Sequence, residues 1–304
     1  RRVGSILVTF FVVSVLVFGL MRAMPGGPFD EDKMPLSEAA RAKLRVQYGL
    51  DGPLHMQYLN YMWGVLRLDF GIPYQSPAET VTDVLARAWP PSFVLGGLGV
   101  LLGTPIGILL GTAAALRRNS LVDYSASVLS TLGVTVPIYV VALMLMLVFS
   151  VWLDWLPTQG WGSPVAWILP VTAYAVGSVA TFARFTRSSM LDVLNQPFVT
   201  VLRAKGLSEG RVVFRHVLKN AAIPVVTIFF PTFILTATGS IFVEKMFRVP
   251  GLGQYFVSSL EKRDYPMEMA LVLILTLLVG VAYLVTDIAY VLLNPRVRVQ
   301  SDDR

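Results

Sequence analysis

The sequence predicts an all-α membrane protein with six transmembrane helices. Of the 304 residues, 55% are hydrophobic and only 14% are charged, whereas a soluble domain carries about 25% charged residues. The apolar residues gather into runs, several of them long enough to cross about 30 Å of hydrocarbon as a helix. The runs lie near 3–21, 90–116, 122–153, 164–183, 224–243 and 269–292. An even number of spans places both termini on one side.

The first run follows two arginines and resembles the start of a signal peptide. The residues after it, Met21-Arg22-Ala23-Met24, are a poor small-residue cleavage site, and the run is long. We therefore expect an uncleaved first span.

The polar region 22–89 predicts two helices outside the bilayer. Ser37 is placed to cap a helix that runs through Tyr48 and stops at Gly49. After Pro53, apolar residues recur at three- and four-residue spacing, which favours a helix on the membrane surface or on a neighbouring chain over a ligand site. These residues are Met56, Leu59, Trp63, Leu66 and Phe70.

The second span carries small residues at every fourth position. The glycines are Gly99, Gly103, Gly107 and Gly111, and Ala115 continues the interval. Such a smooth stripe lets another helix backbone approach closely in lipid. It predicts tight helix packing and indicates nothing about function.

Prolines, glycines and hydroxyl groups interrupt the third and fifth spans. The run 122–153 is too long for one upright helix, so we expect its ends to leave the bilayer core or the helix to tilt. Broken helices in a bilayer either line a cavity or bury their loose carbonyls against other helices. On this basis the candidate pore-lining residues are Pro137, Thr232, Thr236 and Ser240. Threonines there serve equally well as contacts between helices.

Asp287 is the one acidic residue well inside an apolar run. An intramembrane carboxylate is a functional candidate, but its place near one end of the sixth span favours pairing with an arginine of a nearby loop. Because this is a single carboxylate, the sequence shows no proton relay.

The basic residues of the short loops set the orientation. They gather on the side of the N-terminus, above all in the loop at 184–219. The positive-inside rule then places the N-terminus and this loop in the cytoplasm. The same bias accounts for the net charge of +6, so we predict no nucleic-acid partner.

Several kinds of chemistry have no residues to support them. The chain has no cysteine and two histidines, His55 and His216, which are far apart. It has no zinc-protease, nucleophile-elbow or P-loop motif. We therefore predict no catalytic residue, no metal site and no bound cofactor.

The loop between the fourth and fifth spans predicts a knob of two short helices. We expect the fourth helix to extend through 192–196 and to break at Pro197. A short helix over 200–205 would end at Gly206, and Ser208 would cap a second one over 209–219. The basic residues of that second helix share a face, which suits either anionic lipid or a protein partner.

Twelve segments in this order resemble the inner-membrane permease subunits of bacterial ABC importers for oligopeptides and dipeptides, of the B type. Each is weak alone, but the ordered set covers almost the whole chain and is highly specific. The segments are PGGPF at 25–29, YGLDGP at 48–53, QYL at 57–59, DFG at 69–71, LPTQGW at 156–161, ARFTR at 183–187, RAKGL at 203–207, RHVL at 215–218, EKMF at 244–247, PGLG at 250–253, RDYP at 263–266 and NPRVR at 294–298.

The resemblance implies the type I ABC importer permease fold, with a first helix and long extracytoplasmic loop at 1–89, a five-helix core at 90–295 and a cytoplasmic tail at 296–304. It implies a bacterial inner-membrane location and a coupling helix that docks on a cytoplasmic ATPase. The coupling residues it implies are Leu202, Arg203, Ala204, Lys205, Gly206, Leu207, Ser208 and Arg211. The outer-gate or binding-protein contacts it implies are Glu244, Phe247, Pro250, Gly251, Gly253 and Asp264.

The implied partners are a related C-type permease, two ABC ATPase subunits, an extracytoplasmic peptide-binding protein, membrane lipid and the peptide itself. ATP and Mg²⁺ would bind to the ATPases. One departure concerns the wider importer superfamily, which has Glu-Ala-Ala where this chain has Thr200-Val201-Leu202; peptide-type members commonly lack that glutamate. The PGGPF form favours oligopeptides over dipeptides or nickel.

Two other function classes are weighed against this one. A stand-alone secondary carrier or channel would need no ATPase, and uptake by the chain alone would favour it. An intramembrane enzyme would need a nucleophile and a base side by side, and the sequence offers no credible pair.

Overall fold

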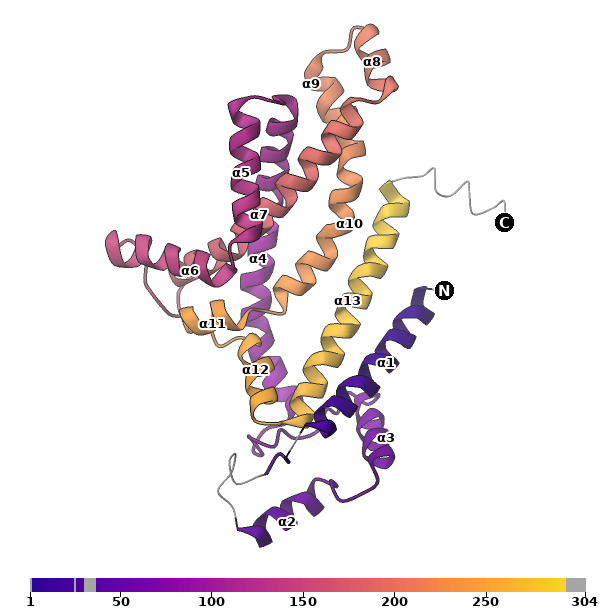
Figure 1. The fold of residues 1–304 in the computed structure, drawn as a ribbon, viewed down its shortest axis with the longest axis vertical. Coiled ribbons are helices and arrows are strands. Elements are labelled where there is room, and N and C mark those ends of the chain that lie inside the picture. The colour runs from indigo at the N-terminus through magenta and orange to yellow at the C-terminus, as the bar shows by residue number, and fades with distance from the viewer. Residues whose placement is uncertain (1, 25, 30–36, 294–304) are drawn as a thin grey trace, which may run out of the picture. The chain divides into compact units, whose positions relative to one another are not determined.

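The computed structural model describes residues 2–24, 26–29 and 37–293, and the regular elements among them are all helices (Figure 1). The chain divides into two compact units, one of Arg1–Pro90 with Gly251–Gly280 and one of Pro91–Pro250 with Val281–Arg304. The predicted division differs from this one, because it assigned 251–280 to the five-helix core. The predicted tail at 296–304 lies outside the described residues.

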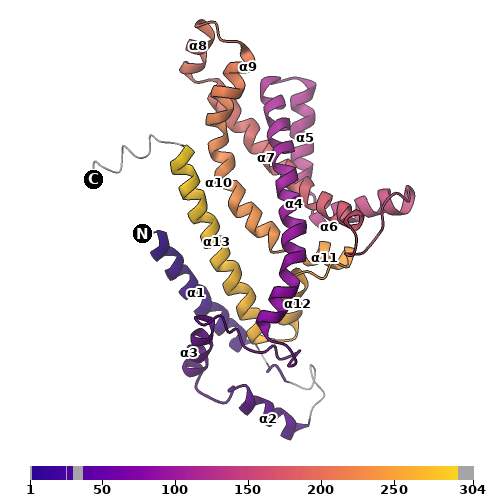
Figure 2. The same ribbon diagram turned by 180° about the vertical axis from the view of Figure 1, so that it is seen from behind.

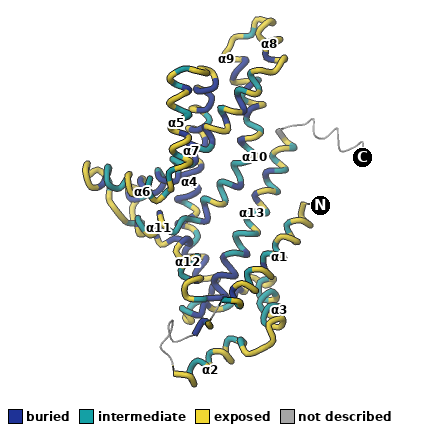
Figure 3. The backbone as a smooth tube through the Cα atoms, viewed as in Figure 1, coloured by how far each residue is buried: buried dark blue, intermediate teal, exposed yellow. Residues whose placement is uncertain are grey.

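The first unit contains α1 (Arg2–Ala23), α2 (Glu38–Gln47), α3 (Leu54–Val65), α12 (Gly253–Glu261) and the beginnings of α4 (Val81–Leu116) and α13 (Tyr265–Leu293). One hydrophobic core packs the start of α4 against α12 and α13 around Leu85, Leu252 and Leu271. A second core contains Phe29, Tyr74 and Tyr265. Most of α1 is exposed (Figure 3), as suits a helix surrounded by lipid.

The predicted helix α2 is confirmed, whereas α3 is shorter than predicted. The Ser37 hydroxyl accepts the Ala40 N–H at 3.3 Å, and Gly49 follows the helix with a φ of 64°. The α3 helix ends at Val65, because the Gly64 carbonyl is bonded instead by the Asp69 N–H at 2.9 Å in a tight turn. Phe70, predicted on the helix face, is buried in the unit's core.

The second unit contains the rest of α4 and α13 together with the elements from α5 to α11. These are α5 (Leu121–Thr135), α6 (Ile138–Met146), the π-helix η1 (Leu147–Trp152), α7 (Pro164–Leu194), α8 (Pro197–Ala204), α9 (Glu209–Arg211), the π-helix η2 (Val212–Val217), α10 (Leu218–Ala237) and α11 (Ile241–Phe247). Figures 1 and 2 show α4 and α5 lying along α7. On α13, Asp287 is half-buried.

The glycine stripe of α4 lies directly on α7. A Cβ at Gly103 would stand 2.6 Å from the Ser178 Cβ, and one at Gly107 would stand 2.8 Å from the Phe182 Cβ. Gly99 and Gly111 meet α7 in the same way at Tyr174 and Ala183. Backbone thus packs on backbone over about three helical turns, and helices in lipid associate through this kind of close contact.

The third apolar run is a broken pair of helices. The axes of Leu121–Thr135 and Ile138–Trp152 are bent by 105°. Val136 is extended with a ψ of 124°, because the residue before a proline is pushed out of the helical region and Pro137 cannot donate a backbone hydrogen bond. The predicted interruption of this run at Pro137 is confirmed, and it takes the form of a sharp bend between two helices.

The fifth span also begins and ends elsewhere than predicted. Helical backbone is continuous from Glu209 to Ala237, so the second short helix predicted at 209–219 is the start of this long helix. Ser208 makes no side-chain cap. The helix stops before Gly239, which has a φ of 93°, and α11 follows as a separate element. Pro224 and Pro231 lie within α10 without ending it.

Five described helices are long and apolar enough to cross a membrane, and the bent pair would make a sixth. These are Arg2–Ala23, Val81–Leu116, Pro164–Leu194, Glu209–Ala237 and Tyr265–Leu292. The predicted all-helical membrane fold is confirmed.

Candidate functional site

The turn between α8 and α9 lies at the far tip of the second unit, beyond the adjoining ends of α7 and α10 (Figure 1). Pro197 is the first residue of α8, where its missing N–H costs nothing. The predicted break before Pro197 is confirmed, since α7 ends at Leu194 and Gln196 is extended, but the short helix starts at 197 and not at 200. The helix ends in a Schellman motif. The Leu207 N–H donates to the Leu202 carbonyl at 3.3 Å, and the Gly206 N–H donates to the Arg203 carbonyl at 2.9 Å.

Gly206 occupies the left-handed position of that motif with a φ of 77°. A side chain there would meet no atom within 4 Å. The need for glycine is therefore a matter of backbone conformation, since a Cβ is disfavoured at positive φ.

Apolar side chains anchor α8 to the rest of the unit. Val199 is fully buried, and Leu202 and Leu207 pack on the same cluster, which includes Met190 of α7 and Val213 of η2. Of the predicted coupling residues, Leu202 and Leu207 therefore face inward. The others, Arg203, Ala204, Lys205, Gly206, Ser208 and Arg211, are exposed.

The outer surface of this tip combines apolar and basic side chains. Phe198, Val201 and Phe214 are exposed, near Lys205 and Arg211 in the chain. Sequence reasoning missed these three apolar residues. The signal was present: Phe198 and Val201 are three residues apart and share one side of α8, about 100° around the helix axis from the side that Val199 and Leu202 share. A large apolar surface with a charged rim is typical of a protein-docking site.

An ion pair closes the turn from outside. The Arg203 guanidinium donates two hydrogen bonds to Glu209, from Nε at 2.7 Å and from NH2 at 3.2 Å. The hydrogen bond to Glu209 raises the pKa of Arg203 above its usual value. Both side chains are solvent-exposed, so the pair orients the turn and contributes little stability.

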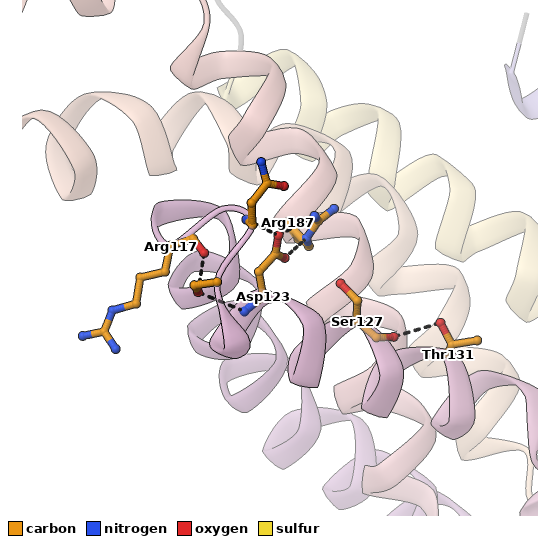
Figure 4. Close-up of polar contacts among 7 residues, drawn as sticks. Arg117, Asp123, Ser127, Thr131 and Arg187 are labelled. Atoms are coloured by element: carbon orange, nitrogen blue, oxygen red, sulfur yellow. Dashed lines mark hydrogen bonds and ion pairs between the residues drawn. The ribbon is translucent and has the colours of Figure 1, made fainter.

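A second polar cluster joins α5 to α7 at the end of the unit where α4 meets α5 (Figure 4). The Arg187 guanidinium grips the Asp123 carboxylate with two hydrogen bonds, one of them 2.9 Å long from NH2. The Asn119 N–H adds a third donor at 3.0 Å. The Asp123 side chain is only 3% exposed. Sequence reasoning missed Asp123 because it stands at the edge of its apolar run.

We expect Asp123→Ala to destabilise the protein by about 2–4 kcal/mol, because it leaves Arg187 largely buried without its anion. Thermal unfolding of the detergent-solubilised protein measures the change. Glu209→Ala is the matched control, since it breaks an exposed pair and should cost less than about 1 kcal/mol. Equal losses in the two variants would contradict a structural role for the Asp123–Arg187 pair.

Comparison with known proteins decides the family. Residues 103–299 match the family model described as "Binding-protein-dependent transport system inner membrane component". The chain belongs to this permease family. Its helical architecture is the type I ABC importer permease fold, and the protein is a multi-pass membrane permease.

Curated relatives match this permease over nearly its whole length. A dipeptide transport system permease protein of Bacillus subtilis is 38% identical over 301 residues, which cover 99% of this chain and 97% of the relative. Oligopeptide transport system permease proteins of Haemophilus influenzae and Salmonella typhimurium are each 37% identical, with 98% of both chains covered.

The predicted outer-gate residues of the permease are mostly inaccessible. Pro250 is exposed, but the other five are buried: Glu244, Phe247, Gly251, Gly253 and Asp264. In this structure those five residues do not reach the surface, and their role as an outer gate or as binding-protein contacts stays a prediction. The exposed neighbours are Phe242, Lys245 and Arg248. Sequence alone did not reveal this because α11 and α12 are short and charged.

Glu244 is held inside the second unit of the permease at the break after α10. The Ser92 hydroxyl donates to its Oε1 at 2.6 Å, and a Cβ on Gly239 would collide with the same carboxylate oxygen. Asp264, in the first unit, accepts the Gln75 N–H at 3.1 Å. Burial raises the pKa of Asp264, and its backbone donors oppose that change. Each carboxylate thus accepts hydrogen bonds that hold a neighbouring segment in place inside its own unit.

The four pore-lining candidates lie at the two helix breaks and along α10. Pro137 begins α6, and Ser240 precedes α11. The two breaks are close, since the rings of Tyr139 and Phe242 are 5.4 Å apart. Thr232 and Thr236 are half-buried on α10, and the Thr236 carbonyl packs against Gly96 of α4. Their role in a pore stays a prediction. Among the described residues there is no group of three or more side chains suited to a metal ion.

Proposed function

We propose that this permease is a non-catalytic translocation subunit of an ATP-driven importer and forms half of a pathway for oligopeptides or dipeptides. Its similarity at 37–38% identity to peptide permeases over nearly the whole chain carries the proposal. An extracytoplasmic binding protein would deliver the peptide. A related C-type permease would complete the pathway, because six helices are few for enclosing a peptide alone.

In this proposal, energy arrives through the α8–α9 turn. Two cytoplasmic ABC ATPases bind ATP and Mg²⁺, and this chain binds neither. The anchored helix with its exposed Phe198, Val201 and Phe214 suits a groove on an ATPase, and the continuous helix from α9 into α10 suits the transfer of movement from this turn. The chain would lie in the bacterial inner membrane with both termini and the turn in the cytoplasm.

Affinity purification of the chain from a native membrane tests the assembly. We expect one sister permease and two ATPase chains to co-purify with it. The complex, reconstituted into liposomes with its binding protein, should take up a labelled tetrapeptide only when ATP is present on the ATPase side.

The rival function, a stand-alone carrier or channel, makes the opposite prediction. The chain alone in liposomes would then take up the tetrapeptide without any ATPase, and that result would overturn the proposal. Competition between dipeptides and tetrapeptides in the complete system would separate the two substrate classes.

A further inference from the structure

An apolar groove of about 790 Å³ lies in the second unit, with α4 and α5 as its walls and α7 as its floor. Its walls are formed by Leu102, Ile106 and Leu110 of α4 and by Leu129 of α5. Ala175 and Ala180, small residues of α7, are on its floor. The Thr172 hydroxyl, one of few polar groups in the lining, is already bonded to the Ile168 carbonyl at 2.7 Å.

The groove is held open by the contacts described above. The glycine stripe seats α4 on α7, and Gly133 seats α5 against Ala180. The Asp123–Arg187 pair fastens the end of α5 to α7. Because both walls are fixed to one floor, the space between them does not close by simple side-chain rearrangement.

Basic side chains stand at one end of this groove. Arg117 and Arg118 lie in the short connection between the walls, and Arg184 follows Ala180 by one helical turn on α7. All three are exposed, and within the described part of the chain none has an ion pair. In Figure 4 the Arg117 side chain points away from Asp123, whose carboxylate is taken by Arg187. Arg118 also interacts with the Asp123 carboxylate, but one carboxylate near four guanidinium groups leaves this end of the groove with a net positive charge.

We propose that the groove binds an acyl chain of an anionic phospholipid, whose headgroup phosphate is held by Arg117 and Arg118. A membrane span followed by a basic loop places apolar surface at tail depth and guanidinium groups at headgroup depth. Guanidinium groups bind phosphate oxygens with paired hydrogen bonds. The connection between α4 and α5 closes that end of the groove. A helix of another protein, about 10–12 Å wide, would collide with this connection, whereas the acyl chain of a lipid would end at its headgroup there.

This inference requires only that the α4–α5 connection lies at a membrane surface, and it goes beyond the proposed transport function. The absence of cysteine makes a single labelled position straightforward. Leu129→Cys on the groove wall would carry a bimane fluorophore, and Val128→Cys is the matched control, because it is similarly exposed on the same helix but does not line the groove. The purified full chain, with the subunits that accompany it, is placed in nanodiscs.

We expect brominated phosphatidylglycerol to quench the Leu129 label much more strongly than brominated phosphatidylcholine at the same mole fraction. Each arginine should contribute roughly a fivefold preference. The two lipids should quench the Val128 label equally. Arg117→Gln with Arg118→Gln should remove the preference at Leu129, whereas Arg45→Gln in α2 should leave it unchanged.

Two results would overturn the proposal. Equal quenching by both lipids at Leu129 would mean that any acyl chain fills the groove without recognition of its charge. An absence of quenching by either lipid at Leu129, with normal quenching at Val128, would mean that a protein segment occupies it.

Discussion

Gly206→Val is expected to abolish ATP-dependent peptide uptake while the chain still inserts into the membrane. Gly206 has a φ of 77°, a conformation that costs a residue with a Cβ about 1–2 kcal/mol and a β-branched residue more. The Schellman motif would open, and Leu207 would lose its register with Leu202. The exposed face of α8 would then no longer hold one orientation toward an ATPase. Uptake into liposomes and ATPase co-purification measure the effect.

Two control substitutions distinguish the effect of the backbone conformation at residue 206 from the effect of adding a side chain to this segment. Gly210→Val places the same side chain four residues on, in α9, at a glycine without a positive φ and with no atom near its Cβ, and should retain most uptake. Gly206→Asn should also retain much of it, because asparagine tolerates the left-handed conformation. Deletion of 202–208 should abolish ATPase association. Gly206→Asp should also abolish it, because aspartate tolerates the backbone conformation as asparagine does but adds a negative charge to an exposed basic turn. Normal coupling in Gly206→Val or in the deletion would refute the docking role of this turn.

Gly103→Leu is expected to prevent accumulation of folded protein. Even an alanine Cβ at Gly103 would lie 2.6 Å from the Ser178 Cβ and 2.8 Å from the Ala175 carbonyl oxygen. Both belong to an adjacent helix, so α4 and α7 would have to separate. Overpacking by a methyl group costs about 1–3 kcal/mol, and a leucine would remove the close approach altogether. Abundance in membranes and a monodisperse elution profile in detergent are the measurements.

Gly177→Ala is the matched control for this prediction. Gly177 lies within α7, but a Cβ there would meet nothing within 4 Å. Because alanine favours a helix over glycine by about 1 kcal/mol in general, this variant should accumulate as well as the native chain. A Gly103→Ala variant should fall between the two. If Gly103→Leu and Gly177→Ala accumulated equally, the stripe would not be a packing surface.

Local patterns predicted the elements that depend on local physics. The cap at Ser37 and the close-packing face of α4 each follow from a few neighbouring residues, and the structure contains both. Helix ends were less predictable, since periodicity continued through Leu66 and Phe70 while a tight turn at Gly64 ended α3 at Val65. The break in the run 122–153 was expected at Pro137, but hydropathy alone does not measure the 105° bend between its two helices.

The sequence did not predict which side chains far apart along the chain contact each other. Glu244 is 152 positions from Ser92, and Asp123 is 64 positions from Arg187. No local period relates either pair, so a charged residue in a short segment was interpreted as exposed. The apolar face of α8 was visible in principle, but its inward and outward sides were distinguished only once Val199 was seen to pack on Met190 and Val213.

The sequence by itself determined that this protein is a helical membrane protein with a basic loop between its fourth and fifth spans, because hydrophobicity, charge bias and glycine spacing follow from the order of residues, and its ordered motifs resembled the permease family. Only the tertiary structure decided which face of that turn is free, which carboxylates are buried and where α4, α5 and α7 leave a groove. These depend on the distance between residues far apart in sequence, and that distance is set by packing.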